Sequence, residues 1–86
     1  MMPLVDVDKT PDPKKIFGET LRTERLKAGL SQEELAHRAI LDRTYVSSCE
    51  RGRRNASLET IIRLANALNL PPSKLLSGFD CSKGNQ

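Results

Sequence analysis

The segment from Leu30 to Asn55, LSQEELAHRAILDRTYVSSCERGRRN, constrains the fold most, because it predicts two short helices joined by a tight turn. Each helix has a narrow apolar side, formed by Leu35, Ala36 and Ala39 in the first and by Val46 and Cys49 in the second. Such sides can be buried only against each other and against helices that come before and after them. The segment therefore predicts a small helical bundle.

The outer face of the second helix carries a polar stripe. Its members recur at i, i+3, i+4 and i+7, and they are Thr44, Ser47, Ser48 and Arg51, with Arg43 beside them. Serine has a low propensity for helix interiors, so two serines in a short helix indicate a functional use for this face. The alternative is that the face is a neutral surface. A stripe of short hydrogen-bonding side chains flanked by cations suits a DNA major groove.

Composition agrees with an all-α chain of one domain. The chain has 86 residues and only 3% aromatic residues, so burial must come from Leu, Ile, Val and Ala, and residues that favour strands are few. The net charge of +3 is a weak signal, but its placement is informative. Within twelve residues, Asp42 and Glu50 are outnumbered by Arg43, Arg51, Arg53 and Arg54.

Several classes of protein find no support in the sequence. No apolar run approaches the roughly 20 residues of a membrane span, and the first residues lack the order of a secretion signal. Cys49 and Cys81 are far apart and predict neither a disulfide framework nor a metal site. We therefore expect a cytoplasmic protein without cofactor or metal. An enzyme is not expected, since paired catalytic groups and a phosphate-binding glycine loop are missing from the sequence.

The chain divides into an arm, a domain and a tail. Residues 1–13 contain three prolines and no periodicity, which predicts a flexible arm, with docking of Leu4, Val5 and Val7 on the domain or a second subunit as the alternative. Residues 14–78 form the predicted domain and residues 79–86 a C-terminal tail. His37, the only histidine, is expected to face solvent.

Capping residues predict where the helices begin and end. The first helix should start near Pro13 and stop at Gly29, and Ser31 with Glu34 forms a capping box for the second. The caps of the third and fourth helices are Asp42 and Ser57, and a short fifth helix should start at Pro71-Pro72 and end at Gly78. The fourth helix has a broad apolar face, which predicts a central place in the bundle, formed by Leu58, Ile61, Ile62, Ala65 and Leu68.

From Phe17 to Leu76 the chain resembles the phage-repressor-like helix-turn-helix family, also called the XRE family. The resemblance is carried by three segments in order, GLSQEELA (29–36), LDRTYVSSCERGRRN (41–55) and SLETIIRLANALNL (57–70). It implies a compact five-helix, lambda-repressor-like DNA-binding domain. The middle segment most resembles the recognition segment of restriction–modification controller proteins, which are small dimers that regulate their own operon and an endonuclease gene.

The resemblance implies a role for each matching residue. Gln32 matches a phosphate anchor, Arg43 and Thr44 match positions that read base edges, and Tyr45 matches an aromatic whose hydroxyl faces DNA. Ser47 and Ser48 match positions whose short side chains approach bases or phosphates. Phosphate contacts are implied for the basic segment that follows, namely Arg51, Arg53 and Arg54, with Asn55 in the same loop.

The resemblance also implies structural contacts. Arg25 and Glu50 match a largely buried salt bridge between the first and third helices. Leu75, Leu76 and Phe79 match a two-fold dimer interface, although closure of the core is the alternative, and we expect some of them inside and some at the interface.

Two positions depart from the family pattern. Ile40 stands where the family usually has glycine, so the turn is either strained or differently shaped. Cys49 replaces a larger aliphatic residue, and a buried thiol there is expected to be inert, with redox sensing as the alternative.

These features predict a sequence-specific transcription regulator that binds a palindromic operator as a homodimer, with RNA polymerase as a further partner. A restriction–modification controller is the subfamily that we expect. The alternative is an antitoxin or adaptor module on the same fold, whose partner would be a toxin.

Overall fold

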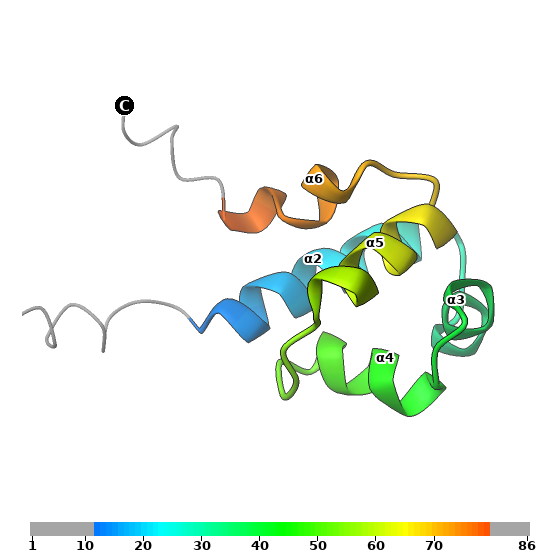
Figure 1. The fold of residues 1–86 in the computed structure, drawn as a ribbon, viewed down its shortest axis with the longest axis horizontal. Helices are drawn as coiled ribbons and strands as arrows, with labels where there is room; N and C mark the ends of the chain where they lie inside the picture. The colour runs from blue at the N-terminus through cyan, green and yellow to red at the C-terminus, as the bar shows by residue number, and fades with distance from the viewer. Residues whose placement is uncertain (1–11, 80–86) are drawn as a thin grey trace, which may run out of the picture.

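The computed structural model describes residues 12–79, which fold into helices connected by short loops (Figure 1). The elements in chain order are α2 (Pro13–Lys27), α3 (Gln32–Ala39), α4 (Arg43–Glu50), α5 (Leu58–Ala67), α6 (Pro72–Leu75) and a 3-10 turn, η1 (Ser77–Phe79). The prediction of an all-α five-helix domain is confirmed.

Side chains fix the start of four helices. The side chain of Asp12 accepts from the Lys14 N–H before α2, and Ser31 and Glu34 form a complete capping box at α3. Asp42 caps α4 and Ser57 caps α5, as predicted. These bonds satisfy N–H groups that the first turn of a helix cannot pair internally, which is why the sequence locates the helix starts so well.

The core lies where α4 packs on α2 and α3, and where α5 packs on α3 and α6. Its largest fully buried side chains are Leu21, Leu35, Leu64, Leu75, Val46 and Cys49. Gly18 allows α2 and α4 to approach closely, because a Cβ at this position would overlap the carbonyl oxygen of Cys49. The close crossing holds α4 firmly at the edge of the bundle.

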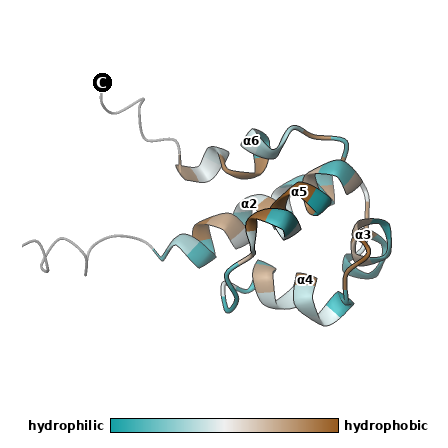
Figure 2. Cartoon of the chain, in the orientation of Figure 1, coloured by the Kyte–Doolittle hydropathy of each residue, from teal (hydrophilic) through white to brown (hydrophobic). Residues whose placement is uncertain are grey.

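The predicted core face of α5 is partly wrong. Leu58 and Ile62 are 71% and 40% exposed, whereas Thr60 and Leu64 are buried. Burial of Thr60 is tolerated because its hydroxyl accepts from the hydroxyl of Ser57. The apolar face of α5, prominent in Figure 2, is thus wider than the surface that α3 and α6 cover.

The turn between α3 and α4 was expected to be either strained or differently shaped, and the structure shows a strained turn. Ile40 has φ 59° and ψ 51°, a left-handed conformation that is costly for a β-branched residue, and its side chain is 79% exposed. The backbone there has the left-handed conformation that glycine adopts readily, so the turn before α4 is formed at the cost of strain at Ile40.

The arm and the tail lie almost entirely outside the described residues, as do Leu4, Val5, Val7 and Cys81. Pro13 is already helical and Phe79 belongs to η1, so helical structure extends one residue beyond each end of the domain we expected. Over residues 12–79, no helix is both long enough and apolar enough to cross a membrane.

Candidate nucleic-acid interface

The first turn of α4 is organised by Asp42. Its carboxylate accepts both the backbone N–H and the hydroxyl of Thr44, at 3.0 Å and 2.9 Å. The N–H bond is the main reason that the pKa of Asp42 lies below its usual value. Thr44 is therefore held as an acceptor, since the hydroxyl proton is already engaged with the cap.

The predicted polar stripe of α4 faces outward. Arg43, Thr44 and Arg51 are exposed, and Ser47 and Ser48 are half-buried. Val46 and Cys49, on the opposite side of the helix, have no exposed surface. The helix is thus anchored by its apolar side and offers the polar side to solvent.

A buried network holds α4 to α2 and α3. Nε and Nη2 of Arg25 donate to the two carboxylate oxygens of Glu50 at 2.6 Å and 2.9 Å, and Nη1 donates to the carbonyl of Leu30. The side chains of Arg25 and Glu50 are only 9% and 3% exposed. The bond to Glu50 raises the pKa of Arg25, so the guanidinium keeps its charge although it is buried. The ion pair implied by the resemblance is present.

Gln32 is part of the same network. Its side-chain nitrogen donates to Glu50 at 3.0 Å, and the residue is half-buried at the start of α3. An amide nitrogen has two N–H donors, so this bond leaves a donor for a phosphate. The structure therefore links the expected phosphate anchor to the residue that orients α4.

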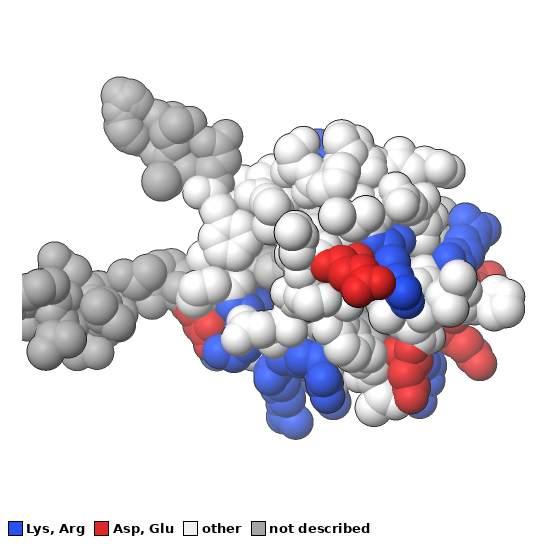
Figure 3. Space-filling model, viewed as in Figure 1, with Lys and Arg blue, Asp and Glu red and all other residues white. Residues whose placement is uncertain are grey.

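The arginine loop follows α4 directly. Arg51 is the C-cap, Gly52 has φ +74°, and both Arg53 and Arg54 are exposed. A Cβ at Gly52 would lie 2.6 Å from Cγ of Lys15, so the loop passes close to α2. Figure 3 shows a group of Lys and Arg side chains at the lower left of the molecule, whereas acidic and basic side chains are mixed at the centre and lower right, and the upper part around α6 is largely uncharged.

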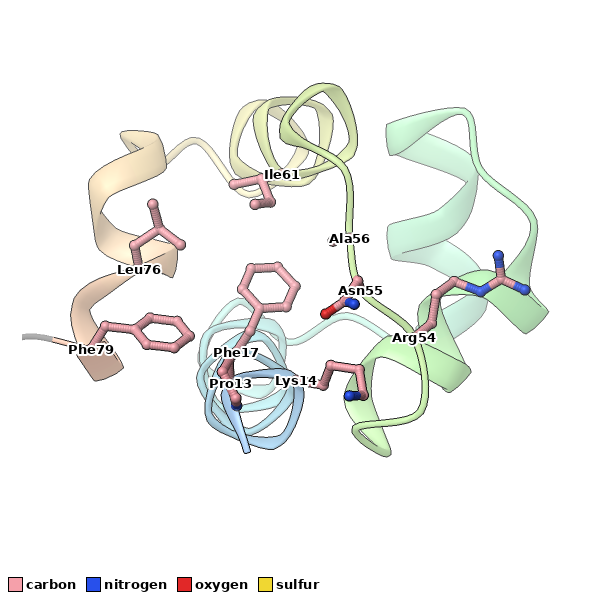
Figure 4. Close-up of a pocket in the computed structure, with 9 residues that line it drawn as sticks. All are labelled: Pro13, Lys14, Phe17, Arg54, Asn55, Ala56, Ile61, Leu76 and Phe79. Atoms are coloured by element: carbon pink, nitrogen blue, oxygen red, sulfur yellow. The ribbon is translucent and has the colours of Figure 1, made fainter. Parts of the chain in front are cut away.

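Two of the expected site residues have other neighbours than the sequence indicated. The guanidinium of Arg54 lies over the ring of Tyr45, 4.7 Å from its centroid. Asn55 is exposed but lines an open cavity of about 120 Å³ between α2, α5 and η1 (Figure 4). Neither contact was expected, because the residues involved are distant from each other in the sequence.

The three residues expected at a dimer interface are divided by the structure. Leu75 has no exposed surface and belongs to the core, so its assignment to the interface is wrong. Leu76 and Phe79 are 40% and 39% exposed, and both line the cavity of Figure 4. A four-residue helix can bury only one side, and α6 uses it for Leu75.

Cys49 lacks the properties of a reactive thiol. It is fully buried, and this burial raises its pKa to about 11. A thiol with that pKa is almost entirely protonated near neutral pH and is a poor nucleophile. The structure gives the redox-sensing alternative no support.

Comparison with known proteins agrees with this geometry. The family described as Helix-turn-helix, of the XRE type, matches residues 21–75. Control protein C.BamHI of Bacillus amyloliquefaciens is 44% identical over 68 residues, which cover 78% of this chain and 84% of that protein. Control protein C.SmaI of Serratia marcescens is 48% identical over 66 residues, covering 77% and 79%.

A solved structure shows the same arrangement of helices. The crystal structure of the restriction-modification controller protein C.AhdI from Aeromonas hydrophila superposes with a TM-score of 0.71 at 50% identity, covering 72% of this chain and 94% of that one. The family match over residues 21–75 includes α3, α4 and α5 and the C-terminal part of α2. The chain belongs to the XRE-type helix-turn-helix family of DNA-binding transcription regulators.

Proposed function

We propose that this regulator binds a palindromic operator as a homodimer and controls the genes of a restriction–modification system. DNA binding is supported most by the outward polar stripe of α4, which is flanked by the exposed side chains of Arg43, Arg53 and Arg54. The similarity to C.BamHI, C.SmaI and C.AhdI supports the controller role. A regulator of this kind acts in the cytoplasm, where the DNA is.

Base reading is assigned to the start of α4. Arg43 offers two parallel donors, which match O6 and N7 of guanine, and its place in the first turn puts it at the end of the helix that enters the groove first. Thr44 would act as an acceptor, because Asp42 takes its proton. The half-buried Ser47 and Ser48 let the helix approach the bases closely.

Phosphate contacts are assigned to the flanking groups. Gln32 lies at the N-terminus of α3, where free N–H groups and the helix dipole favour an anion. Arg51, Arg53 and Arg54 extend from the other end of α4. Contacts at both ends would fix the register of the helix, and their energy would fall steeply with salt.

The homodimer is supported by an apolar surface that the fold leaves uncovered. We define the α5–η1 surface as the exposed large hydrophobic residues Leu58, Ile62, Leu76 and Phe79. Leu58 and Ile62 are one turn apart on α5, and Ile61 between them lines the same cavity as Leu76 and Phe79. On α5, Leu58 and Ile62 lie beside the exposed ion pair of Glu59 and Arg63, and the residues of the proposed DNA-binding face lie on α3, on α4 and in the loop after α4.

Two copies joined through this surface would leave both α4 helices free. A symmetric pair doubles the DNA contact and requires two half-sites about 34 Å apart or a multiple of that distance. One recognition helix alone gains only about 1–3 kcal/mol of discrimination from each good base contact. Dimerisation therefore supplies specificity that the monomer lacks.

Selection of duplexes from a random pool tests the function. The chain should enrich a palindrome, Arg43→Ala should relax the preferred base at one position of each half-site, and Arg53→Ala should weaken all duplexes alike. Binding of Arg43→Ala and Arg53→Ala equal to that of the unaltered chain, on enriched and random duplexes, would refute the assignment.

The antitoxin or adaptor alternative uses the same exposed hydrophobic residues. A toxin seated on the α5–η1 surface would replace the second copy, so a purified chain that stays monomeric and yet binds such a partner stoichiometrically would favour this alternative. Contact with RNA polymerase is a separate proposal, tested by transcription from the enriched operator with purified polymerase in the presence and absence of the chain.

A further inference from the structure

Arg54 differs from its neighbours in the arginine loop. Its guanidinium carbon lies 4.7 Å from the centre of the Tyr45 ring, although nine positions separate the two residues in the sequence. Tyr45 belongs to the first turn of α4 and Arg54 to the loop after the helix. The contact therefore ties that loop back to the beginning of the recognition helix.

The ring of Tyr45 is held by the core as well. Tyr45 is half-buried and packs against the cluster of buried hydrophobic residues. The charge of Arg54 also acts on Cys49, one turn further along α4, where it opposes the effect of burial on the pKa of that thiol. Arg54 thus acts on two residues of α4, on Tyr45 by contact and on Cys49 through its charge.

The stem and the head of Arg54 have different surroundings. The stem lines the cavity shared with Phe17 and Asn55, and Figure 4 shows the guanidinium directed away from that cavity. A side chain supported at its base and stacked at its head has given up much of its freedom before any ligand arrives. This preparation lowers the entropy cost of later contacts made by either residue.

We propose that Arg54 is a positioning residue, which fixes the Tyr45 ring at the rim of the DNA-binding face rather than serving only as one more phosphate contact. The inference rests on the proposed function. Lysine is a poorer partner here, since its ammonium is a compact point charge, whereas the planar guanidinium can also stack on an aromatic face. The adjacent Arg53 is exposed and provides a matched control.

The contact can be tested without DNA. The chain has one tyrosine and no tryptophan, so tyrosine fluorescence reports on Tyr45 alone. Arg54→Lys should change this emission and Arg53→Lys should not. In NMR spectra, the side-chain protons of Arg54 should be shifted upfield by the ring, and Tyr45→Leu should remove the shift. Absence of the shift in the unaltered chain overturns the proposal.

Discrimination between duplexes tests the positioning role. The probes are a duplex enriched by the unaltered chain from a random pool and a scrambled duplex of the same composition. Arg54→Lys should lower the ratio of the two affinities about two- to fivefold, which is the range expected for an exposed cation–π contact. Its salt dependence should stay unchanged, because the charge is kept.

A double-mutant cycle separates positioning from simple charge. In the Tyr45→Leu background, Arg54→Lys should have no further effect on the affinity ratio, whereas Arg53→Lys should have equally little effect in both backgrounds. Equal behaviour of Arg54→Lys and Arg53→Lys, or additive effects in the cycle, overturns the inference. Failure of the unaltered chain to enrich any duplex overturns the proposed function instead, so the two failures are distinguishable.

Discussion

Arg25 and Glu50 form the most consequential pair of residues in the bundle. Almost no solvent reaches either side chain, and Glu50 also accepts from Gln32. Arg25 of α2 and Gln32 of α3 both donate to Glu50 of α4, so the ion pair and this hydrogen bond connect the three helices. No buried side-chain polar atom of the described region, those of this network included, lacks a hydrogen-bond partner. Such completeness matters because a half-satisfied buried network costs more than an apolar core.

Removing one member of this pair should be severe. Arg25→Met leaves the Glu50 carboxylate buried with Gln32 as its remaining side-chain donor, and the free energy of unfolding should fall by about 3–5 kcal/mol. Denaturant unfolding measures this change. The double variant Arg25→Met/Glu50→Leu should be less destabilised than the sum of the single variants, because no charge is stranded. Strict additivity would show that the two residues do not interact.

Ile40 should be a site of easy stabilisation. Its left-handed conformation costs a β-branched residue about 1–2 kcal/mol, while its exposed side chain buries little surface. Ile40→Gly should therefore raise the free energy of unfolding by about 1 kcal/mol, even after the larger entropy of glycine in the unfolded chain. Ile40→Val keeps the strain and should leave stability nearly unchanged. A less stable glycine variant would mean that the turn is not strained.

The helices begin where carboxylates and hydroxyls cap them, and three of these caps titrate. The pKa values of Asp12, Glu34 and Asp42 lie below their usual values, in each case mainly because a backbone N–H donates to the carboxylate. A depressed pKa in the folded state means that the contribution to stability is present at neutral pH. It is lost as the pH falls through the folded-state pKa, below the usual values of 3.8 for aspartate and 4.5 for glutamate.

Asp42→Asn isolates one of these caps. Asparagine caps a helix about as well as aspartate but does not titrate, so the variant should lose less stability than the unaltered chain between neutral pH and about pH 3. Thermal unfolding followed by circular dichroism across this range measures the difference. Identical pH profiles for the two proteins would show that the Asp42 cap contributes nothing to the acid sensitivity.

The crossing of α2 and α4 depends on Gly18. Alanine normally favours a helix by about 0.5–1 kcal/mol over glycine. At Gly18 its Cβ would instead overlap the backbone of Cys49 and Glu50, and backbone cannot give way as a flexible side chain can. Gly18→Ala should lower the free energy of unfolding by about 1–3 kcal/mol. Thr23→Ala, at an exposed position of the same helix, is the control, and a stabilised Gly18→Ala would mean that the helices are further apart.

At the scale of the whole molecule, the arginines of the proposed DNA-binding face and the exposed large hydrophobic residues belong to different elements. The arginines proposed to contact DNA belong to α4 and the loop after it, whereas the α5–η1 surface belongs to α5 and the C-terminal turns, where the ion pair of Glu59 and Arg63 lies beside Leu58 and Ile62. A small bundle can bury only part of its apolar residues, and the remainder become useful when a second copy covers them. In the proposed dimer, the α5–η1 surface would associate while the α4 side binds DNA.

The double variant Leu58→Lys/Ile62→Lys tests the association. Both positions are exposed in the monomer, so the fold should persist while the proposed dimer dissociates. Sedimentation should show a monomer, and affinity for the enriched palindrome should fall far more than affinity for scrambled duplex. Leu26 is an exposed leucine on α2, outside the α5–η1 surface, so the control variant Leu26→Lys should remain dimeric. A dimer that survives the double variant would place the interface elsewhere.

Local sequence signals determined much of this protein. Helix starts follow from Ser31, Asp42 and Ser57, each a side chain that caps the backbone within three residues of itself. The outward stripe of α4 follows from helical periodicity, which also needs only neighbouring residues. The family was evident because three such segments occur in a fixed order.

The tertiary structure alone decided which surfaces are covered. The apolar face of α5 includes Leu58 and Ile62 by periodicity, yet the neighbouring helices leave both exposed and bury Thr60 instead. Leu75 points inward and Arg54 stacks on Tyr45 because of where the chain returns after a loop. A residue's own sequence neighbourhood sets its helix and its side of that helix, but the amount of that side that is buried depends on how distant segments pack against it.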